Sequence, residues 1–302
     1  MAKHLILGAG PVAAALAARL LASGHDVAAA TRSGTRLPGV APLRLDAVDS
    51  GALTRAARGS DAMFVCTNPP YHQWAGQWPP LIESAARASA ATGARIVLMG
   101  NLYAYGIPDG PMREDSPLHP ADTKGKVRQR IWERLQQLQE EGRIQAAEVR
   151  ASDYFGPGSQ AHAHLGPRFL RPLLNSKTAW VVGNPALAHS WAYLPDIAAT
   201  LEAASVEPAM GRAWLVPHSG QQDRLGIADQ VNSLAGSRGR VRSYPGLLWK
   251  TGGKFSPAMR EIGASSYPFM HRFVVDSRET ERALGVSATP FEQALQLSIE
   301  DA

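Results

Sequence analysis

Short apolar runs alternate along the first half of the chain with longer segments in which small and apolar residues recur at helical spacing. The apolar runs predict β-strands that end at Leu7, Ala30, Asp46, Thr67 and Met99. The segments between them predict helices that begin near Pro11 and cover 50–58 and 80–91. Strands that alternate with helices at these distances predict right-handed βαβ units and therefore a parallel sheet.

A glycine-rich turn follows the first predicted strand. Gly8 and Gly10, with Ala13 in the third small position, form the pattern G-x-G-x-x-A. The first glycine permits a sharp turn, the second lets the backbone approach a pyrophosphate, and the small third residue lets helix and strand pack closely. The phosphates would lie at the free N–H groups where the helix begins, at Pro11 and Val12. Between a strand and an Ala/Leu-rich helix, this pattern predicts a dinucleotide site.

The end of the second predicted strand discriminates between the two nicotinamide dinucleotides. NAD sites usually carry an acid there, about 20 residues beyond the glycines, which binds the ribose 2′-hydroxyl. Thr31 occupies this place, and Arg32 and Ser33 follow it, with Arg36 nearby. Arginine suits a 2′-phosphate because its planar donors bind two oxygens; the alternative is a solvated loop arginine. We therefore expect NADP as the cofactor, with NAD as the second choice.

The third and fourth predicted strands end at the same edge of the sheet, where open α/β sheets bind their ligands. We therefore expect the residues at these ends to contact the cofactor: Asp46, Ala47, Thr67, Asn68 and Pro69. Residues 68–80 form a loop in this prediction and carry Tyr71, Trp74 and Trp78.

The simple alternation of strands and helices is lost in the second half of the chain, over 156–177 and 220–272. Residues 1–155 are the predicted dinucleotide-binding domain, to which 190–205 and 273–277 return, and 156–302 is predicted to be mainly a substrate-binding lobe. The predicted fold class is α/β: a Rossmann-type, doubly wound parallel sheet with a smaller, interleaved C-terminal α/β lobe.

Composition and charge exclude several classes of function. The 302-residue chain is 45% hydrophobic and 19% charged, which is typical of a globular protein. Its net charge of +5 comes without a Lys/Arg run interleaved with aromatics, so no nucleic-acid partner is predicted. Cys66 is the only cysteine, which excludes an internal disulfide and agrees with a reducing cytoplasm. No membrane span is predicted, and Pro11 and Arg19 interrupt the apolar N-terminal stretch that resembles a secretory signal.

Several motifs match one known family in order and spacing. Tyr105-Gly106 follows the fifth predicted strand, and VRASDYFGPG (149–158), SWAYLPDIAATL (190–201) and VVDSRETERALGVSATPFEQAL (274–295) come after it. With these motifs the chain resembles the extended short-chain dehydrogenases/reductases, of the NAD-dependent epimerase/dehydratase type, over nearly its whole length. The resemblance implies an NAD(P)-binding oxidoreductase or epimerase that acts on a hydroxyl or carbonyl of a small or nucleotide-linked substrate.

The catalytic residues of that family are replaced in this chain. The family has a Ser or Thr four residues before Tyr-Gly, and its next helix begins with Tyr-x-x-x-Lys, whose Tyr exchanges a proton with the substrate. Here Asn101 takes the first position, and the helix start DTKGKVRQR contains no tyrosine. The overlay places Lys124 at the Tyr position and Arg128 at the Lys position, with Lys126 as a rival. The resemblance therefore implies an atypical active site; a solvated helix face is the alternative role for these cations.

Other residues of the expected cleft can supply the missing chemistry. Tyr103 lies two residues beyond Asn101 and is the candidate substitute acid, while Asn101 can hydrogen-bond a substrate oxygen. The walls of the substrate pocket are expected to include Tyr71, Tyr154, His162, His164 and Trp191. His162 and His164 alternate along the chain, but a metal site needs a further ligand, so no metal is predicted.

Two functions from different classes fit this sequence. The first is an NAD(P)-dependent enzyme with an atypical active site, and the second is a non-catalytic NAD(P)-binding sensor or regulatory protein. Loss of both catalytic residues favours the second, whereas a cleft rich in aromatic and histidine residues favours a small-molecule substrate. By analogy with the family, a homodimer would form through residues 80–91 and 123–139.

Overall fold

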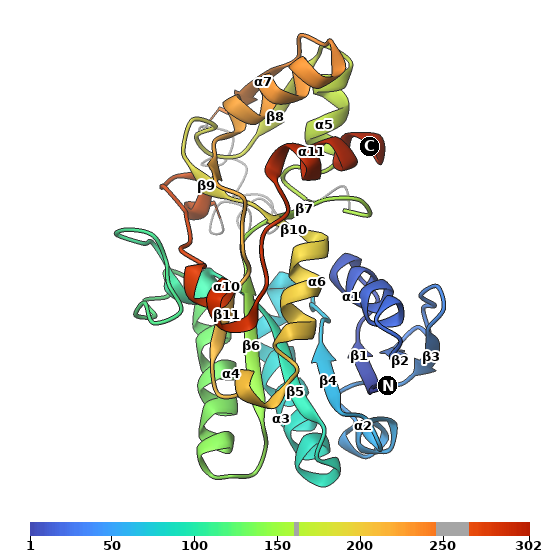
Figure 1. The fold of residues 1–302 in the computed structure, drawn as a ribbon. Helices are drawn as coiled ribbons and strands as arrows, with labels where there is room; N and C mark the ends of the chain where they lie inside the picture. The colour runs from blue at the N-terminus through green and yellow to red at the C-terminus, as the bar shows by residue number, and fades with distance from the viewer. Residues whose placement is uncertain (160–162, 246–265) are drawn as a thin grey trace.

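Seven parallel strands form the central sheet of the computed structural model, which describes residues 1–159, 163–245 and 266–302. The strand order is β11-β6-β5-β4-β1-β2-β3 (Figure 1). The strands are β1 (Lys3–Leu7), β2 (Asp26–Thr31), β3 (Ala41–Arg44), β4 (Ala62–Val65), β5 (Arg95–Asn101), β6 (Ala146–Ala151) and β11 (Ala213–Leu215). The order reverses between β1 and β4, so the carboxyl ends of these two strands define the crevice in which doubly wound sheets bind ligands.

Helices cover both faces of the sheet, which confirms the predicted Rossmann-type fold class. Helices α1 (Pro11–Ala22) and α6 (Leu194–Ala203) cover one face, and α2 (Ser50–Ala57), α3 (Trp74–Thr92) and α4 (Thr123–Glu140) cover the other. Alternate residues of one strand enter different cores: Ile6 packs with the α1 side, and Leu5 and Leu7 pack with the α3 side. The strands read as continuous apolar runs because both of their faces are buried.

A second lobe lies beyond the carboxyl ends of the strands (Figure 1). Its elements are β7 (Tyr154–Phe155), α5 (Pro167–Leu174), β8 (Thr178–Val181), β9 (His189–Ser190), β10 (Ala192–Tyr193), β12 (Gln221–Gln222), α7 (Arg224–Ala235), β13 (Arg240–Ser243) and α11 (Phe291–Glu300). They enclose a separate core that includes Leu173, Ile227 and Phe269. The lobe is interleaved with the sheet domain, because α6 leaves it to pack on α1.

The chain crosses between the two parts a last time through residues 273–277. Val275 forms a parallel bridge with Met112, in the long loop that follows β5, and Phe273 forms one with His189 of the second lobe. Phe273 is buried and Tyr267, from the short helix η4 (Tyr267–Phe269), packs edge-on against it. This crossing segment therefore forms part of the wall between the sheet and the lobe.

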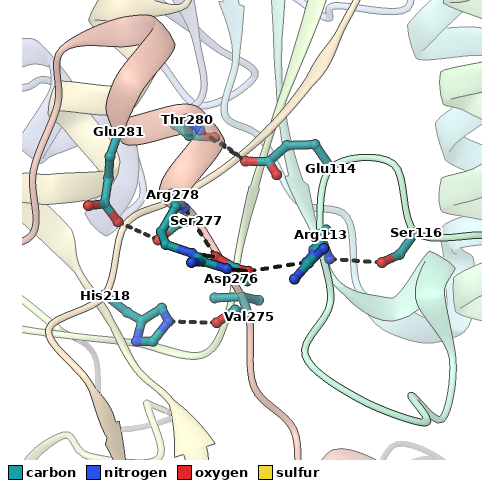
Figure 2. A network of polar contacts seen from close by, with 10 residues as sticks. All are labelled: Arg113, Glu114, Ser116, His218, Val275, Asp276, Ser277, Arg278, Thr280 and Glu281. Atoms are coloured by element: carbon teal, nitrogen blue, oxygen red, sulfur yellow. Dashed lines mark hydrogen bonds and ion pairs between the residues drawn. The ribbon is translucent and has the colours of Figure 1, made fainter.

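A network of charged residues fixes the crossing segment against the loop after β5 (Figure 2). Arg278, the first residue of α10 (Arg278–Leu284), donates to both carboxylate oxygens of Asp276 at 2.7 and 2.6 Å, and Arg113 donates to one of them at 3.1 Å. On the neighbouring turn, the Thr280 hydroxyl donates to Glu114. The hydrogen bond from Arg278 lowers the pKa of Asp276 to about 2, and the nearby Arg113 charge contributes.

Two elements differ from the sequence prediction. Helix α3 begins at Trp74 rather than near residue 80, so Trp74 and Trp78 lie on a helix and not in a loop. Both indoles are buried at helical spacing, and this burial outweighs the two exposed prolines, Pro79 and Pro80. The sequence also does not predict β11, a three-residue strand that extends the sheet beside β6.

Candidate cofactor-binding and active site

The glycine turn after β1 has the geometry that the motif requires. Gly8 has a φ of +121°, and a Cβ there would lie 3.0 Å from the backbone nitrogen of Thr67. Only glycine combines that dihedral with so close an approach to the end of β4. Gly10 precedes α1, Pro11 is its first residue, and no side chain caps its N-terminal N–H groups. These N–H groups are therefore available to an anionic ligand.

A cavity of about 580 Å³ lies on the β2–β3 side of this turn. Thr31, Arg32 and Ser33 line it from the end of β2, and Asp46, Ala47 and Pro69 line it from later strand ends. The Thr31 hydroxyl accepts a hydrogen bond from the backbone N–H of Thr35, which shapes the turn, and Arg32 is exposed. No acid follows β2 directly, so this end of the cavity offers a guanidinium and the hydroxyls of Thr31, Ser33 and Thr35.

A second cavity, of about 450 Å³, lies on the other side of the turn, beneath the second lobe. Gly10, Pro11 and Val12 line it, whereas Ala13 is fully buried and packs helix α1 onto the sheet. Both cavities are lined by Gly8, Ala9, Thr67 and Asn68, so they meet at the glycine turn. The geometry suits an elongated ligand with an anionic middle and two larger ends.

The second cavity brings three of the four predicted catalytic residues together: Asn101, Tyr103 and Arg128. The Asn101 side-chain oxygen accepts a hydrogen bond from the backbone N–H of Tyr103 at 3.1 Å, which fixes the turn into η2 (Tyr103–Tyr105). Burial raises the pKa of Tyr103 well above its usual value, and hydrogen bonding to Tyr71 adds to this effect. Tyr103 is therefore held in its neutral, proton-donating form.

Lys124 and Arg128 lie one turn apart on the inner face of α4, and both are nearly fully buried. The N-terminus of α4 is fixed by Asp122, whose carboxylate accepts from the N–H of Gly125. The rival Lys126 is exposed on the same helix. Lys124 does not line the cavity; its ammonium lies 5.1 Å from the centre of the Tyr71 ring.

The Arg128 guanidinium is held between two tryptophans. Its central carbon lies 4.6 Å from the Trp74 ring centre and 4.1 Å from that of Trp78, and it donates to the carbonyl oxygen of Met99 at 3.0 Å. Burial lowers its pKa to about 10, and its Nε–H has no hydrogen-bond partner in the described structure. A buried cation with an unused donor, at the wall of a cavity, fits a site for a polar or anionic ligand group.

The predicted substrate residues divide into two groups. Tyr71 and Tyr154 line the second cavity. Trp191 and His164 do not line it, because Trp191 is buried in the second-lobe core with its indole N–H bound to the carbonyl of Gln222, and His164 packs on Phe269. His162 lies outside the described residues.

A polar cluster at the end of β6 is centred on Asp153, which the sequence did not single out. Asp153 lines the second cavity, and its carboxylate is 2.9 Å from His189 Nε2 and 4.0 Å from His164 Nε2. Burial favours the protonated acid, but the His189 hydrogen bond and the nearby charges outweigh it, so the pKa of Asp153 lies below its usual value. Burial also lowers the pKa of His164. Asp153 is thus an anionic acceptor that faces the cavity.

The described residues contain no thiol suited to act as a nucleophile, no group of metal ligands and no helix that could span a membrane. Cys66 lines the second cavity, but burial raises the pKa of its thiol to about 12, so it is no nucleophile at neutral pH. Within 1–159, 163–245 and 266–302, no three His, Cys, Asp or Glu side chains are grouped to hold a metal ion. No helix in these ranges is long and apolar enough to cross a bilayer.

Comparison with known proteins agrees with this geometry. The model of the NAD dependent epimerase/dehydratase family matches residues 4–214. A curated relative, the dTDP-6-deoxy-L-talose 4-dehydrogenase (NAD(P)(+)) of Kitasatospora kifunensis, is 28% identical over 174 residues, which are 53% of this chain and 54% of the relative. The chain thus spans about half the length of that relative.

Solved structures share the fold over nearly the whole chain. A putative epimerase from Burkholderia cenocepacia J2315 has a TM-score of 0.81 at 18% identity, covering 99% of this chain and 97% of that one. UDP-glucuronic acid 4-epimerase from Bacillus cereus, in complex with UDP-glucuronic acid and NAD, has a TM-score of 0.79 at 16% identity, covering 99% and 98%. At these identities, the likeness shows a common fold.

Proposed function

This chain belongs to the NAD dependent epimerase/dehydratase family of enzymes, and we propose that it transfers hydride at a hydroxyl or carbonyl carbon of its substrate. The observation that carries this proposal is the pair of cavities that meet at the glycine turn. The adenosine end of a dinucleotide fits the first cavity, its pyrophosphate fits the uncapped N-terminus of α1, and its nicotinamide end fits the second. When bound, the cofactor supplies or accepts the hydride; binding, orientation and proton transfer fall to this chain's own residues.

NADP is the cofactor that we propose first, and NAD is the second choice. Arg32, Ser33 and Thr31 line the first cavity at the end of β2, where an acid for the ribose 2′-hydroxyl is absent from the sequence. In favour of NAD, the complex of the Bacillus cereus epimerase contains that nucleotide, while the curated dehydrogenase is named for both.

A pair of arginine variants tests the choice of cofactor. Arg32→Ala is expected to weaken NADPH binding about tenfold or more and leave NADH binding nearly unchanged, since the guanidinium would contact only the 2′-phosphate. Arg36→Ala is the matched control, because Arg36 is exposed on the same turn but does not line the cavity. Fluorescence titration of both nucleotides measures the two affinities. An equal loss for NADH and NADPH would refute the assignment.

The substrate proposed for the second cavity is a small or nucleotide-linked molecule that carries a hydroxyl or carbonyl group. Named relatives act on, or are bound to, nucleotide-linked sugars, which makes these the first compounds to try. Asn101 and Asp153 line the cavity as hydrogen-bonding groups, and Tyr71 and Tyr154 supply aromatic walls. We propose that these residues orient the substrate.

A cofactor-binding sensor without turnover is the second candidate. It is favoured by the sequence overlay, which puts Lys124 at the position of the family's tyrosine. The two candidates differ in a single experiment, in which NADPH and NADH binding are titrated and hydride turnover is then followed with carbonyl compounds and sugar nucleotides. Binding without turnover across a broad panel would favour the sensor, and failure to bind either nucleotide would refute both.

A further inference from the structure

Tyr71 occupies a position that no other phenol of the site shares. It belongs to η1 (Tyr71–Gln73), which follows the loop after β4, and it lines the second cavity while 45% of the residue remains exposed. The ammonium of Lys124 lies 5.1 Å from its ring centre. The Arg128 guanidinium, one turn further along α4, lines the same cavity. A cation of α4 therefore lies beside a phenol that comes from a different element.

The other tyrosines around the cavity are suited to remain neutral. Burial raises the pKa of Tyr103, of Tyr154 and of Tyr267, and the negative charge of Asp153 adds to the effect on each. Tyr103 hydrogen-bonds to Tyr71, so a neutral phenol supports the Tyr71 oxygen. Cations beside the ring and a hydrogen-bonding neighbour both favour negative charge on a phenol oxygen.

We propose that Tyr71 is the proton-transfer residue of this site and that Lys124, beneath its ring, stabilises the phenolate. The proposal rests on the oxidoreductase function proposed above. In the oxidative direction, the substrate hydroxyl gives its proton to the Tyr71 oxygen, the hydrogen on the same carbon leaves with its electron pair to the nicotinamide ring, and the carbon becomes a carbonyl. Tyr71 changes from phenolate to phenol, and both transfers reverse in reduction.

Nitration by tetranitromethane tests the pair without any substrate, because this reagent attacks phenolates. Peptide mass spectrometry compares Tyr71 with Tyr244, a tyrosine of similar exposure (40%) outside the cavity. Relative to Tyr244, nitration of Tyr71 is expected to slow about tenfold in Lys124→Met and to be restored in Lys124→Arg, which keeps the positive charge. Saturating nucleotide is expected to protect Tyr71 and not Tyr244. Equal Tyr71 rates in the wild type and in Lys124→Met would overturn the pairing.

Turnover then tests the catalytic role. Tyr71→Phe is expected to lower kcat at least 100-fold, the usual contribution of general acid–base catalysis, with nucleotide affinity within about twofold of the wild type. Tyr244→Phe is the matched control, because it removes a phenol of similar exposure outside the cavity, and its kcat should change less than about twofold. An unchanged kcat in Tyr71→Phe overturns this proposal and leaves the oxidoreductase function intact. If the wild type binds no nucleotide, the oxidoreductase function is refuted. The nitration comparison then still tests whether Lys124 stabilises the Tyr71 phenolate.

Discussion

A buried ion pair at the carboxyl end of the sheet leads to the most quantitative prediction. Glu148 and Arg150 of β6 are only 1% and 3% exposed, and Arg150 Nε donates to Glu148 Oε2 at 2.7 Å. Arg150 also donates to the Tyr105 hydroxyl at 2.8 Å. On the neighbouring strand, a Cβ at Gly100 would overlap the Glu148 carboxylate, so the pair fills space that a glycine leaves open beside the active-site turn.

Arg150→Met removes the cation but keeps a side chain of similar length. It leaves Glu148 as an unpaired buried charge and Tyr105 without its donor, so the free energy of unfolding should fall by about 3–5 kcal/mol. The double variant Glu148→Gln/Arg150→Met also removes the buried negative charge. Its loss should be only about 1–3 kcal/mol, the range for a buried polar group that lacks a partner. The double variant is therefore expected to be more stable than the single one.

Urea unfolding followed by circular dichroism measures these free energies from the midpoint and slope of each transition. Arg143→Met is the control, because Arg143 pairs with Glu141 on the surface at 3.4 Å with both side chains well exposed. Its unfolding free energy should change by less than about 1 kcal/mol. If Arg150→Met is no more damaging than this control, or if the double variant is less stable than Arg150→Met, the electrostatic reasoning is wrong.

Three further variants test the turn, the cation and the crossing segment. Gly8→Ala should weaken NADH and NADPH binding at least tenfold in fluorescence titrations, whereas Gly59→Ala, with φ of +72° but open surroundings, should leave binding unchanged. Arg128→Met should weaken the same binding about tenfold but change the unfolding free energy in urea by less than about 1 kcal/mol, because the cost of burying a guanidinium offsets much of its ring contacts. The pKa of Asp276, which pairs with Arg278, is lowered to about 2. Its carboxylate therefore stabilises the fold at any pH above the usual pKa of an aspartate, and this stabilisation is lost as the pH falls towards 2. At pH 7 the melting temperature of Asp276→Asn should therefore be lower than that of the wild type. Between pH 5 and pH 2 the melting temperature of the variant should fall by less than that of the wild type; equal falls would contradict this.

The parts of the fold that were predictable from the sequence depend on local pattern. Strands with both faces buried give continuous apolar runs, and the turn after β1 needs glycine for its backbone alone, so both appear in the sequence as residue types. Lys124 and Arg128 are four residues apart, and in the structure both lie buried on one face of α4.

The parts that were not predictable depend on contacts between distant segments. Asp153 and His189 are 36 residues apart, and no local pattern announces that they will meet beside the cavity. The sequence predicts Trp74 and Trp78 in a loop, yet burial of both indoles around a guanidinium extends the helix across them. The sequence predicts Trp191 in the wall of the substrate pocket, but its side chain is buried in the core of the second lobe.

The two ends of the site are constrained to different degrees by the fold. The cofactor end relies on backbone: a glycine with positive φ and the N-terminus of a helix, which persist in any sequence that keeps glycine at position 8. The proton-transfer end relies on one oxygen atom, which any nearby element can supply. In this chain three phenols, from η1, η2 and β7, line the same cavity. Family membership therefore predicts nucleotide binding more tightly than it predicts which residue transfers the proton.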